Sequence, residues 1–274
     1  MSPFAARRWA AAILTLGGAA LFAIVMGRRY ASLAEAAYFS GWTLLAITLV
    51  LAAYSVRKKL PYPPLLSSSA WLQMHVYIGV LSAPVFLAHI WPLPPTGPLE
   101  ITLAILFTAL FLSGVLGLIL SRIVPPRLSV RGEEVLFERI PVHRRRLRER
   151  AEELVVAAVR EADATTLTDF YARHLAGSFG GPRHFWRHVC QAGGPRQRLI
   201  DELRSLDRYL DERERPLALE LAEIIDAKDA LDYHHAMQGV LKGWLFVHVP
   251  LTYVTLVFVA VHVVVVHTFA GAAT

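Results

Sequence analysis

The sequence predicts an all-α integral membrane protein with five transmembrane helices and a helical cytoplasmic insert before the last of them. Composition is the first reason. Hydrophobic residues make up 55% of the 274 residues and charged residues 18%, whereas soluble domains carry about 25% charged residues. The second reason is that five apolar stretches reach the roughly 20 residues that a helix needs to cross a bilayer. These stretches are residues 9–26, 38–56, 70–91, 99–123 and 240–269.

Basic residues are distributed unevenly over the loops between these stretches, and this predicts the orientation of the chain. One set of alternate loops holds Arg7 and Arg8, the run 57–59 and the basic segment HRRRLRER at 143–150. The opposite set holds only Arg28 and Arg29. Cytoplasmic loops carry the excess of Lys and Arg. We therefore expect a bacterial-type inner (plasma) membrane protein, with the N-terminus and insert cytoplasmic and the C-terminus extracytoplasmic.

Three regions follow from this pattern. Residues 1–124 hold the first four spans, residues 125–239 form the polar insert, and residues 240–274 hold the fifth span. The insert is predicted to be helical because leucines recur at helical spacing within it. These leucines are Leu199, Leu203, Leu206 and Leu210.

Composition also excludes several classes of protein. Cys190 is the only cysteine, which excludes internal disulfides, Cys-ligated iron–sulfur clusters and a CxxCH site for covalent haem. The net charge of +6 arises around the apolar stretches, since residues 1–124 carry eight Lys and Arg but two acids. Membrane topology explains such an excess, so a nucleic-acid partner is not expected.

Two histidine pairs share one spacing. HVYIGVLSAPVFLAH begins at His75 and ends at His89, and HVPLTYVTLVFVAVH begins at His248 and ends at His262. Fourteen helical residues rise about 21 Å and end roughly 40° short of four full turns. Each pair therefore lies on nearly one helix face, at two depths. Because the third and fifth spans run in the same direction, His75 is expected to face His248 at the cytoplasmic level, and His89 to face His262 at the outer level.

Two facing imidazoles in a helical bundle are the usual axial ligands of a low-spin haem b. The spacing therefore predicts two haem b groups, each with two histidine ligands to iron. The bland alternative is that each histidine is a helix–helix hydrogen-bond partner or lines a polar path. His267 competes with His262, but it lies about 100° around the helix from His248 and is left out of the ligand set.

This arrangement of H-x13-H on two parallel helices, separated by one antiparallel helix, resembles the dihaem b-type cytochromes. They include the cytochrome b of quinol–cytochrome c oxidoreductases and the transmembrane domains of ferric reductases and NADPH oxidases. The resemblance covers roughly residues 38–269 without the insert, and it implies a four-helix haem-binding bundle made by the second to fifth spans. By this resemblance His75 and His248 hold the iron of the inner haem, and His89 and His262 hold that of the outer haem.

The resemblance implies an electron-transfer subunit of an oxidoreductase complex, with no catalytic residue of its own. Electrons would pass between a quinone pool or cytoplasmic donor and an extracytoplasmic partner, such as a c-type cytochrome or an iron–sulfur protein. These 274 residues predict no sixth span and no flavin or nicotinamide domain, and the insert resembles neither family. Two alternatives remain open: a haem-free transporter or channel lined by histidines, and a membrane anchor that recruits partners through the insert.

Weaker candidates complete the set. Four glycines in the spans offer a flat surface either to a porphyrin or to a neighbouring helix: Gly41, Gly79, Gly114 and Gly117. Basic residues near the inner level suit either haem propionates or membrane anchoring: Arg57, Lys58, Lys59, Arg122 and Lys242. In the insert, His184 and His188 have a spacing that can hold a metal, but no third ligand is evident nearby and solvated surface histidines are the favoured interpretation. The patch RHFWRH suits an anionic partner, a quinone head group or lipid, and Tyr233, His234 and His235 suit a proton relay at a quinone site.

Overall fold

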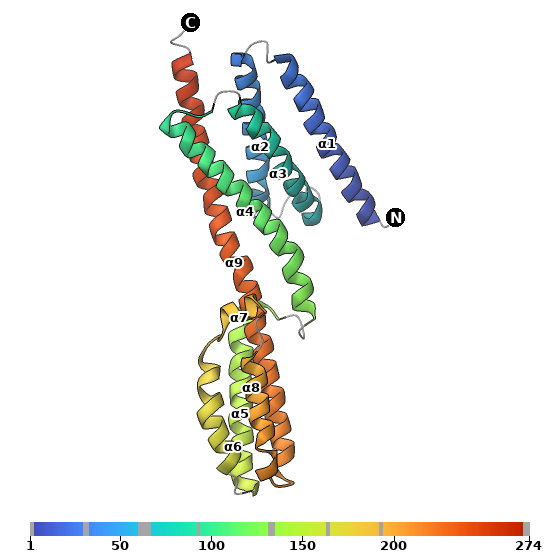
Figure 1. The fold of residues 1–274 in the computed structure, drawn as a ribbon, viewed down its shortest axis with the longest axis vertical. Helices are drawn as coiled ribbons and strands as arrows, with labels where there is room; N and C mark the ends of the chain where they lie inside the picture. Colours follow the sequence, from blue (N-terminus) through green and yellow to red (C-terminus); the bar gives the residue numbers. More distant parts are fainter. Residues whose placement is uncertain are drawn as a thin grey trace. The chain divides into compact units, whose positions relative to one another are not determined.

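The computed structural model describes residues 3–29, 33–59, 67–91, 94–130, 135–162, 165–191 and 194–270. These ranges are mostly helical and contain no β-strand (Figure 1). The chain folds as two compact units. Unit 1 comprises Met1–Ile119 together with Trp244–Thr274, and unit 2 comprises Leu120–Gly243. The long helices α4 and α9 each contribute residues to both units.

Unit 1 is built from long apolar helices. They are α1 (Pro3–Arg29), α2 (Leu33–Lys59), α3 (Ser68–Ile90), most of α4 (Pro98–Ser129) and the second half of α9 (Glu214–Ala270). Each of these five helices is long and apolar enough to cross a membrane, among the residues described. The predicted helical class and the five predicted spans are thereby confirmed, and they indicate a multi-pass membrane protein.

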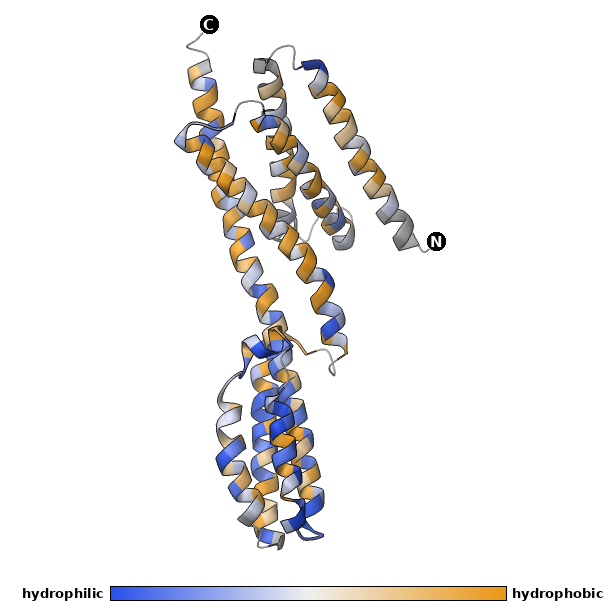
Figure 2. Ribbon diagram, viewed as in Figure 1, coloured by the Kyte–Doolittle hydropathy of each residue, from blue (hydrophilic) through white to orange (hydrophobic). Residues whose placement is uncertain are grey.

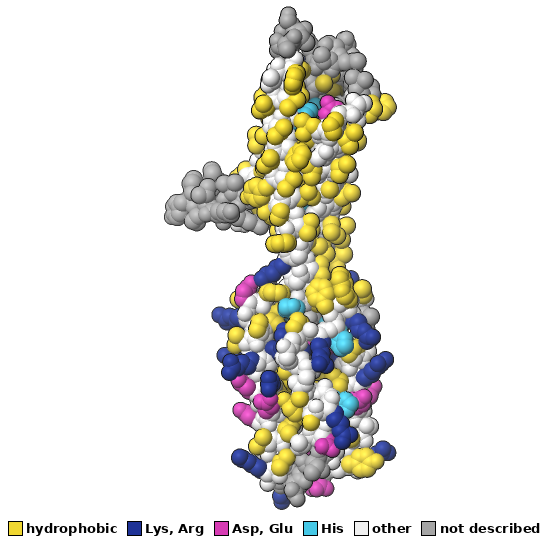
Figure 3. Space-filling view, turned by 90° about the vertical axis from the view of Figure 1, so that its left-hand side faces the viewer, with side chains coloured by type: hydrophobic (Ala, Val, Ile, Leu, Met, Phe, Trp, Pro, Cys, Tyr) yellow, Lys and Arg dark blue, Asp and Glu magenta, His cyan; other side chains and the backbone are white. Residues whose placement is uncertain are grey.

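The side chains of unit 1 are arranged for an apolar surrounding. Large hydrophobic residues point outward, such as Leu14, Leu112 and Phe246, and hydrophobic side chains cover the face of these helices in Figure 3. Among the buried residues are the hydroxyls of Ser40 and Thr255. Each hydroxyl donates a hydrogen bond to a carbonyl of its own helix, which satisfies the polar group without water.

Helices α2, α3, α4 and α9 form a ring in which each helix makes side-chain contacts with the next. The α2–α3 contact includes Ser40 and His89, and α3 meets α4 where Phe86 stacks on Phe107 with ring centroids 4.1 Å apart. The α4–α9 contact includes Ser113, and α9 returns to α2 through His267, whose ring lies 5.6 Å from that of Trp42. Within this set α3 and α9 run in one direction and α2 and α4 in the other (Figure 1). Helix α1 packs beside α3 and α2.

Unit 2 is a bundle of amphipathic helices. Its elements are η1 (Phe137–Arg139), α5 (Ile140–Ala162), α6 (Thr165–Phe170), the π-helix η2 (Tyr171–Leu175), η3 (Ala176–Gly180), α7 (Phe185–Val189), α8 (Pro195–Ser205), η4 (Asp207–Tyr209) and the first half of α9. Buried Leu167, Leu175, Phe179 and Leu221 belong to one apolar core. The helices of this unit alternate hydrophobic and hydrophilic residues (Figure 2), the pattern of a water-facing bundle.

Helix α9 passes through residues 239 and 240 without a break. The sequence predicts the end of the polar insert and the start of the last span at these residues. The helix runs without interruption over 57 residues, from Glu214 to Ala270. Pro216 lies in its first turn, where a missing N–H costs nothing. Pro250 lies in the interior, where a membrane helix tolerates it. A change of hydropathy alone therefore does not end a helix.

Candidate functional site

His89 projects from the last turns of α3 against a small-residue site on α2. Its Nδ1 lies 3.1 Å from the Oγ of Ser40, which is fully buried. The next residue, Gly41, lets the ring approach the backbone closely, because a Cβ built at Gly41 would be 3.0 Å from the His89 Cε1. A serine and a glycine on α2 thus fix both the position and the plane of this imidazole.

The hydrogen bonds of Ser40 determine which His89 nitrogen carries the proton. The Ser40 hydroxyl donates its one proton to the Ala36 carbonyl at 2.8 Å, with the Ala37 carbonyl at 3.0 Å. Its oxygen is then left to accept a hydrogen bond from the Nδ1–H of His89. In a neutral imidazole only one nitrogen carries a proton. The Nε2 of His89 therefore keeps a lone pair, the state that metal ligation requires.

His262 of α9 is close enough to His89 of α3 for direct electrostatic interaction between the two imidazoles. The carboxylate of Glu100, in the first turn of α4, acts electrostatically on the same ring. Glu100 also accepts hydrogen bonds from the backbone N–H groups of Thr96 and Gly97, at 3.3 and 3.4 Å. The structure therefore places the His89 and His262 imidazoles within electrostatic range of each other, with one carboxylate in their surroundings.

His248 has a setting on α4 that repeats the setting of His89 on α2. Its Nδ1 lies 3.2 Å from the Oγ of Ser113, and a Cβ at Gly114 would be 3.8 Å from its Cε1. The indole of Trp244 stacks on the His248 ring at 5.2 Å and donates from Nε1 to the Ser113 carbonyl at 2.8 Å. Each histidine is therefore seated on a Ser–Gly pair of the helix beside it: 40–41 for His89 and 113–114 for His248.

The other two histidines of the spans have aromatic neighbours on α2. The His75 ring lies 5.1 Å from that of Tyr54. The His267 ring makes edge contacts with Tyr38 and Trp42 at 5.9 and 5.6 Å, and its Nδ1 bonds the Val263 carbonyl at 2.8 Å. These contacts pack His267 against α2. Its omission from the ligand set and the pairing of His75 with His248 both remain predictions.

Glycines in the spans serve different neighbours. A Cβ at Gly117 would overlap the Trp244 ring, so only a glycine leaves room for the indole at this position. Gly41 and Gly114 admit the two imidazoles, as described above. A Cβ at Gly79, one turn after His75, would meet nothing within 4 Å. Of the four glycines, Gly79 is the one that faces open space.

The candidates in unit 2 are dispersed. His184 lies ahead of α7 in a left-handed conformation, with φ 58°, so it does not share a helix with His188. Among the described residues, no group of three His, Cys, Asp or Glu is placed to hold a metal ion. Tyr233 and His234 are buried, and His235 stacks on Phe137 with centroids 4.9 Å apart.

Of the basic candidates, Lys242 is already engaged, since its Nζ donates to the Glu138 Oε1 at 2.5 Å and lies 3.9 Å from the centre of the Phe137 ring. The side chains of Arg57, Lys58 and Lys59 lie outside the described residues.

Sequence reasoning missed Ser40, Ser113 and Trp244. The signal that was available is the dipeptide Ser–Gly, which occurs inside two of the apolar spans, as FSGW at 39–42 and LSGV at 112–115. A hydroxyl beside a glycine in a membrane helix marks a place where another helix or a ring approaches closely.

Comparison with protein-family models, with curated proteins and with solved structures found no match to this chain. The chemistry of the site is therefore argued from its own residues.

Proposed function

We propose that this chain is a membrane-embedded dihaem cytochrome b subunit that carries electrons across the membrane. His89 and His262 would hold the iron of an outer haem b, and His75 and His248 that of an inner haem b. A haem with two imidazole ligands exchanges single electrons and leaves no iron position open to oxygen. The chain would then act inside an oxidoreductase complex.

The single observation that carries this proposal is the proximity of His89 and His262. They come from α3 and α9, which contact α2 and α4 but run in the same direction as each other. An imidazole contributed by each of two such helices is the ligand set of a bis-histidine haem. A packing role for a lone histidine does not require a second histidine opposite it.

The state of the imidazoles fits iron ligation. Metal-bound histidines donate their other ring N–H to an oxygen, which fixes the tautomer and the ring orientation. Ser40 provides that oxygen for His89 at 3.1 Å, and the Ser113 hydroxyl lies at the corresponding distance of 3.2 Å from His248. Each serine therefore engages the Nδ1 of its histidine, which leaves the Nε2 as the nitrogen that would hold iron.

The inner pair follows from the outer pair by helix geometry. His75 precedes His89 by fourteen residues and His248 precedes His262 by the same number. On two helices that run in the same direction, equal spacing moves both residues by about 21 Å along the axis. A level that holds His89 and His262 therefore implies a second level for His75 and His248.

The distribution of basic residues over the loops predicts which side of the membrane each end of the electron path faces. The positive-inside rule favours a bacterial-type inner membrane with a cytoplasmic insert and an extracytoplasmic C-terminus. The inner haem would then exchange electrons with a quinone or a cytoplasmic donor. The outer haem would exchange them with an extracytoplasmic partner such as a c-type cytochrome or an iron–sulfur protein.

Haem content tests the proposal directly. The chain purified from haem-replete cells should show reduced-minus-oxidised bands of low-spin haem b and two haems per chain. His262→Ala should retain one haem. The matched control is His267→Ala, five residues further along α9, which should retain both. A colourless wild-type preparation would refute the proposal, and loss of haem only in the His267 variant would move the ligand role to His267.

A haem-free, histidine-lined proton or cation path is the second candidate function. The observation that favours it is Glu100, whose carboxylate acts on His89 beside His262, because paired carboxylates and histidines mark proton relays in membranes. This candidate predicts that Glu100→Gln abolishes proton or cation flux in proteoliposomes made with colourless protein. The cytochrome proposal predicts a coloured protein in which Glu100→Gln retains both haems.

A further inference from the structure

Unit 2 contains a cavity of about 420 Å³ that the electron-transfer proposal does not use. Its walls come from η2 and η3, from the segment 183–188, from α8 and from the polar half of α9. The volume lies within the range of about 300–1,000 Å³ that small-molecule sites occupy. We call it the arginine pocket, because four arginines line it: Arg183, Arg187, Arg196 and Arg198.

The charges of the pocket do not balance. Four arginines and Lys228 line it, against three carboxylates. Asp232 pairs with Lys228, Glu202 lies 3.2 Å from His174, and Asp229 lies 3.9 Å from His188.

Among the arginines, Arg196 makes two hydrogen bonds to Asp226, at 2.7 and 2.9 Å. No carboxylate partner is found for Arg183, Arg187 or Arg198 among the described residues. The pocket therefore carries an excess of guanidinium groups.

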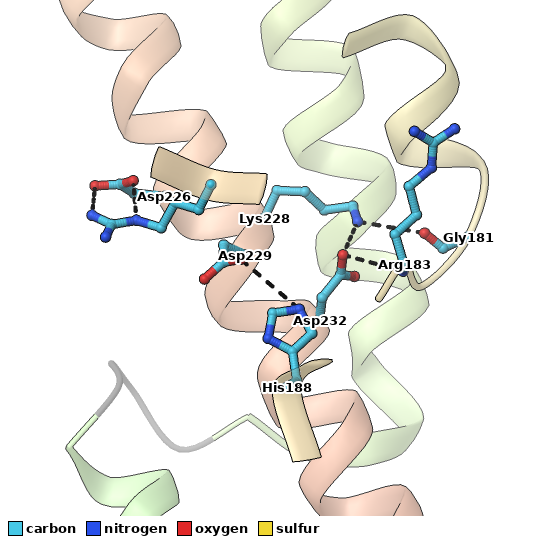
Figure 4. Close-up of polar contacts among 8 residues, drawn as sticks. Gly181, Arg183, His188, Asp226, Lys228, Asp229 and Asp232 are labelled. Carbon is cyan, nitrogen blue, oxygen red and sulfur yellow. Dashed lines mark hydrogen bonds and ion pairs between the residues drawn. The ribbon is translucent and has the colours of Figure 1, made fainter. Parts of the chain in front are cut away.

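The buried end of the pocket is fixed by a hydrogen-bond network (Figure 4). The Lys228 ammonium donates to Asp232, and the backbone N–H of Arg183 donates to the same carboxylate oxygen at 3.3 Å. Lys228 also reaches the Gly181 carbonyl at 3.4 Å. Because Lys228 neutralises Asp232 in the interior, this carboxylate does not repel an anion, and the network holds Arg183 at the wall.

The backbone around the pocket supplies a further positive partial charge. Helix α8 begins at the pocket wall with Pro195 and Arg196, has no side-chain cap and has no acidic residue in its first turn. The N-terminus of a helix carries a partial positive charge, and its free N–H groups bind anions. At Gly194, just before this helix, φ is 141°, a conformation open to glycine and rarely to other residues.

Irregular backbone is concentrated on the same walls. The π-helix Tyr171–Leu175 contributes His174 and Leu175, and the left-handed residue His184 lines the pocket as well. π-Helical turns and left-handed non-glycine residues cost energy and occur mainly where function requires them. Packing of the bundle alone would not need either feature.

We propose that the arginine pocket binds a phosphate or diphosphate group. Guanidinium groups match the oxygens of a phosphate in a bidentate arrangement. Arg187 and Arg198 are the principal ligands, together with the N-terminus of α8. The Arg183 guanidinium, which donates to the Gly177 carbonyl at 2.8 Å, adds positive charge to the lining. The phosphate belongs either to a soluble phosphorylated metabolite or to a lipid head group. Neither source requires that the chain binds haem.

Binding of inorganic pyrophosphate to the full chain in neutral detergent, measured by titration calorimetry, tests this proposal. Wild type should bind one pyrophosphate saturably, and Arg187→Gln with Arg198→Gln should weaken binding by roughly tenfold or more. The matched control is Arg145→Gln with Arg148→Gln. These arginines on α5 pair with Glu149 and Glu152, and their loss should change affinity by less than about twofold.

The absence of saturable binding in wild type would overturn the proposal, as would an equal loss in both double variants. The source of the phosphate is then identified in nanodiscs. If phosphatidylglycerol weakens pyrophosphate binding relative to phosphatidylcholine, a lipid head group occupies the pocket. If the two lipids give the same affinity, the ligand is soluble. Circular dichroism of each variant shows that the helices are retained.

Discussion

Units 1 and 2 are both helical, yet they place their side chains in opposite ways. In unit 1 large apolar residues face outward, and the buried positions include hydroxyls and small side chains such as Ser40 and Thr255. In unit 2 leucines and phenylalanines fill the core, and charged pairs such as Arg150 with Glu220 lie on the surface. The same helix, α9, follows one rule in its first half and the other in its second half. The surrounding solvent, not the helix, therefore decides which residues are inside.

Buried polar groups show the same difference. The hydroxyls of Ser40 and Thr255 inside unit 1 donate hydrogen bonds to carbonyls of their own helix. The Ser40 oxygen also accepts a hydrogen bond from the His89 ring. The buried polar pair of unit 2, Lys228 and Asp232, is ionic. Hydroxyls cost little to bury when they are bonded, whereas a buried charge is stable only with its partner.

The largest expected effect comes from breaking the ionic pair. Lys228→Met leaves Asp232 buried without its counter-charge and should destabilise unit 2 by about 3–5 kcal/mol. Lys228→Met with Asp232→Leu removes both charges and should restore most of that loss. Thermal unfolding of the purified chain, followed by circular dichroism, measures both. Equal destabilisation by the single and double variants would show that the charges are not coupled.

The same pair predicts a pH dependence. Burial lowers the pKa of Lys228 below its ordinary value of 10.5, and this effect outweighs the attraction of Asp232. The folded chain therefore holds this proton less tightly than the unfolded chain. Stability from this group rises with pH between the lowered pKa and 10.5. The double variant should lack that rise, so a similar slope in wild type and double variant would contradict the assignment.

Replacement of an exposed leucine by lysine should be costly in unit 1 and nearly neutral in unit 2. Leu112, 60% exposed in the middle of α4, faces the apolar surrounding, and Leu219, 70% exposed on α9, faces water. Leu112→Lys should reduce membrane insertion, at a cost of about 2.5–3.5 kcal/mol, whereas Leu219→Lys should stay within about 0.5 kcal/mol of wild type. The amount of each variant in isolated membranes measures the difference. Equal accumulation would remove the distinction between the units.

Close packing in unit 1 should depend on which glycine is replaced. Gly117→Ala drives a methyl group into the Trp244 ring and should cost about 1–3 kcal/mol, while Gly79→Ala meets open space. The melting temperature of the detergent-solubilised chain should therefore fall for Gly117→Ala and stay near wild type for Gly79→Ala. The opposite order would mean that Trp244 does not lie on Gly117.

The smallest expected effect is on the basicity of the His89 imidazole. Ser40→Ala removes the hydrogen-bond acceptor of the His89 Nδ1–H. On the dihaem proposal this ligand becomes less basic, and the potential of one haem should rise. The control, Thr48→Ala, removes a hydroxyl that bonds the Leu44 carbonyl of its own helix, and both potentials should stay unchanged. Redox titration measures the two haems separately. A shift in the Thr48 variant but not in the Ser40 variant would reject the role of Ser40.

The sequence predicts the class and the spans well because the spans follow from hydropathy and length alone. It does not predict the packing of α1 beside α3, nor the seating of His89 and His248 on Ser–Gly pairs. These depend on which faces of helices far apart in the chain meet. The sequence also does not show that α9 continues without interruption through residues 239 and 240, because the change in hydropathy there marks the end of the insert and not the end of a helix. The arginine pocket requires residues from four separate segments, so no local pattern contains it.

The central claim is that the four histidines act as two pairs, and haem content per chain in two double variants tests it most directly. His89→Ala with His262→Ala removes both ligands of one haem, so the chain should retain one haem. His89→Ala with His248→Ala removes one ligand from each haem, so the chain should retain none. Equal haem content in the two double variants, or the reverse order, would contradict the pairing.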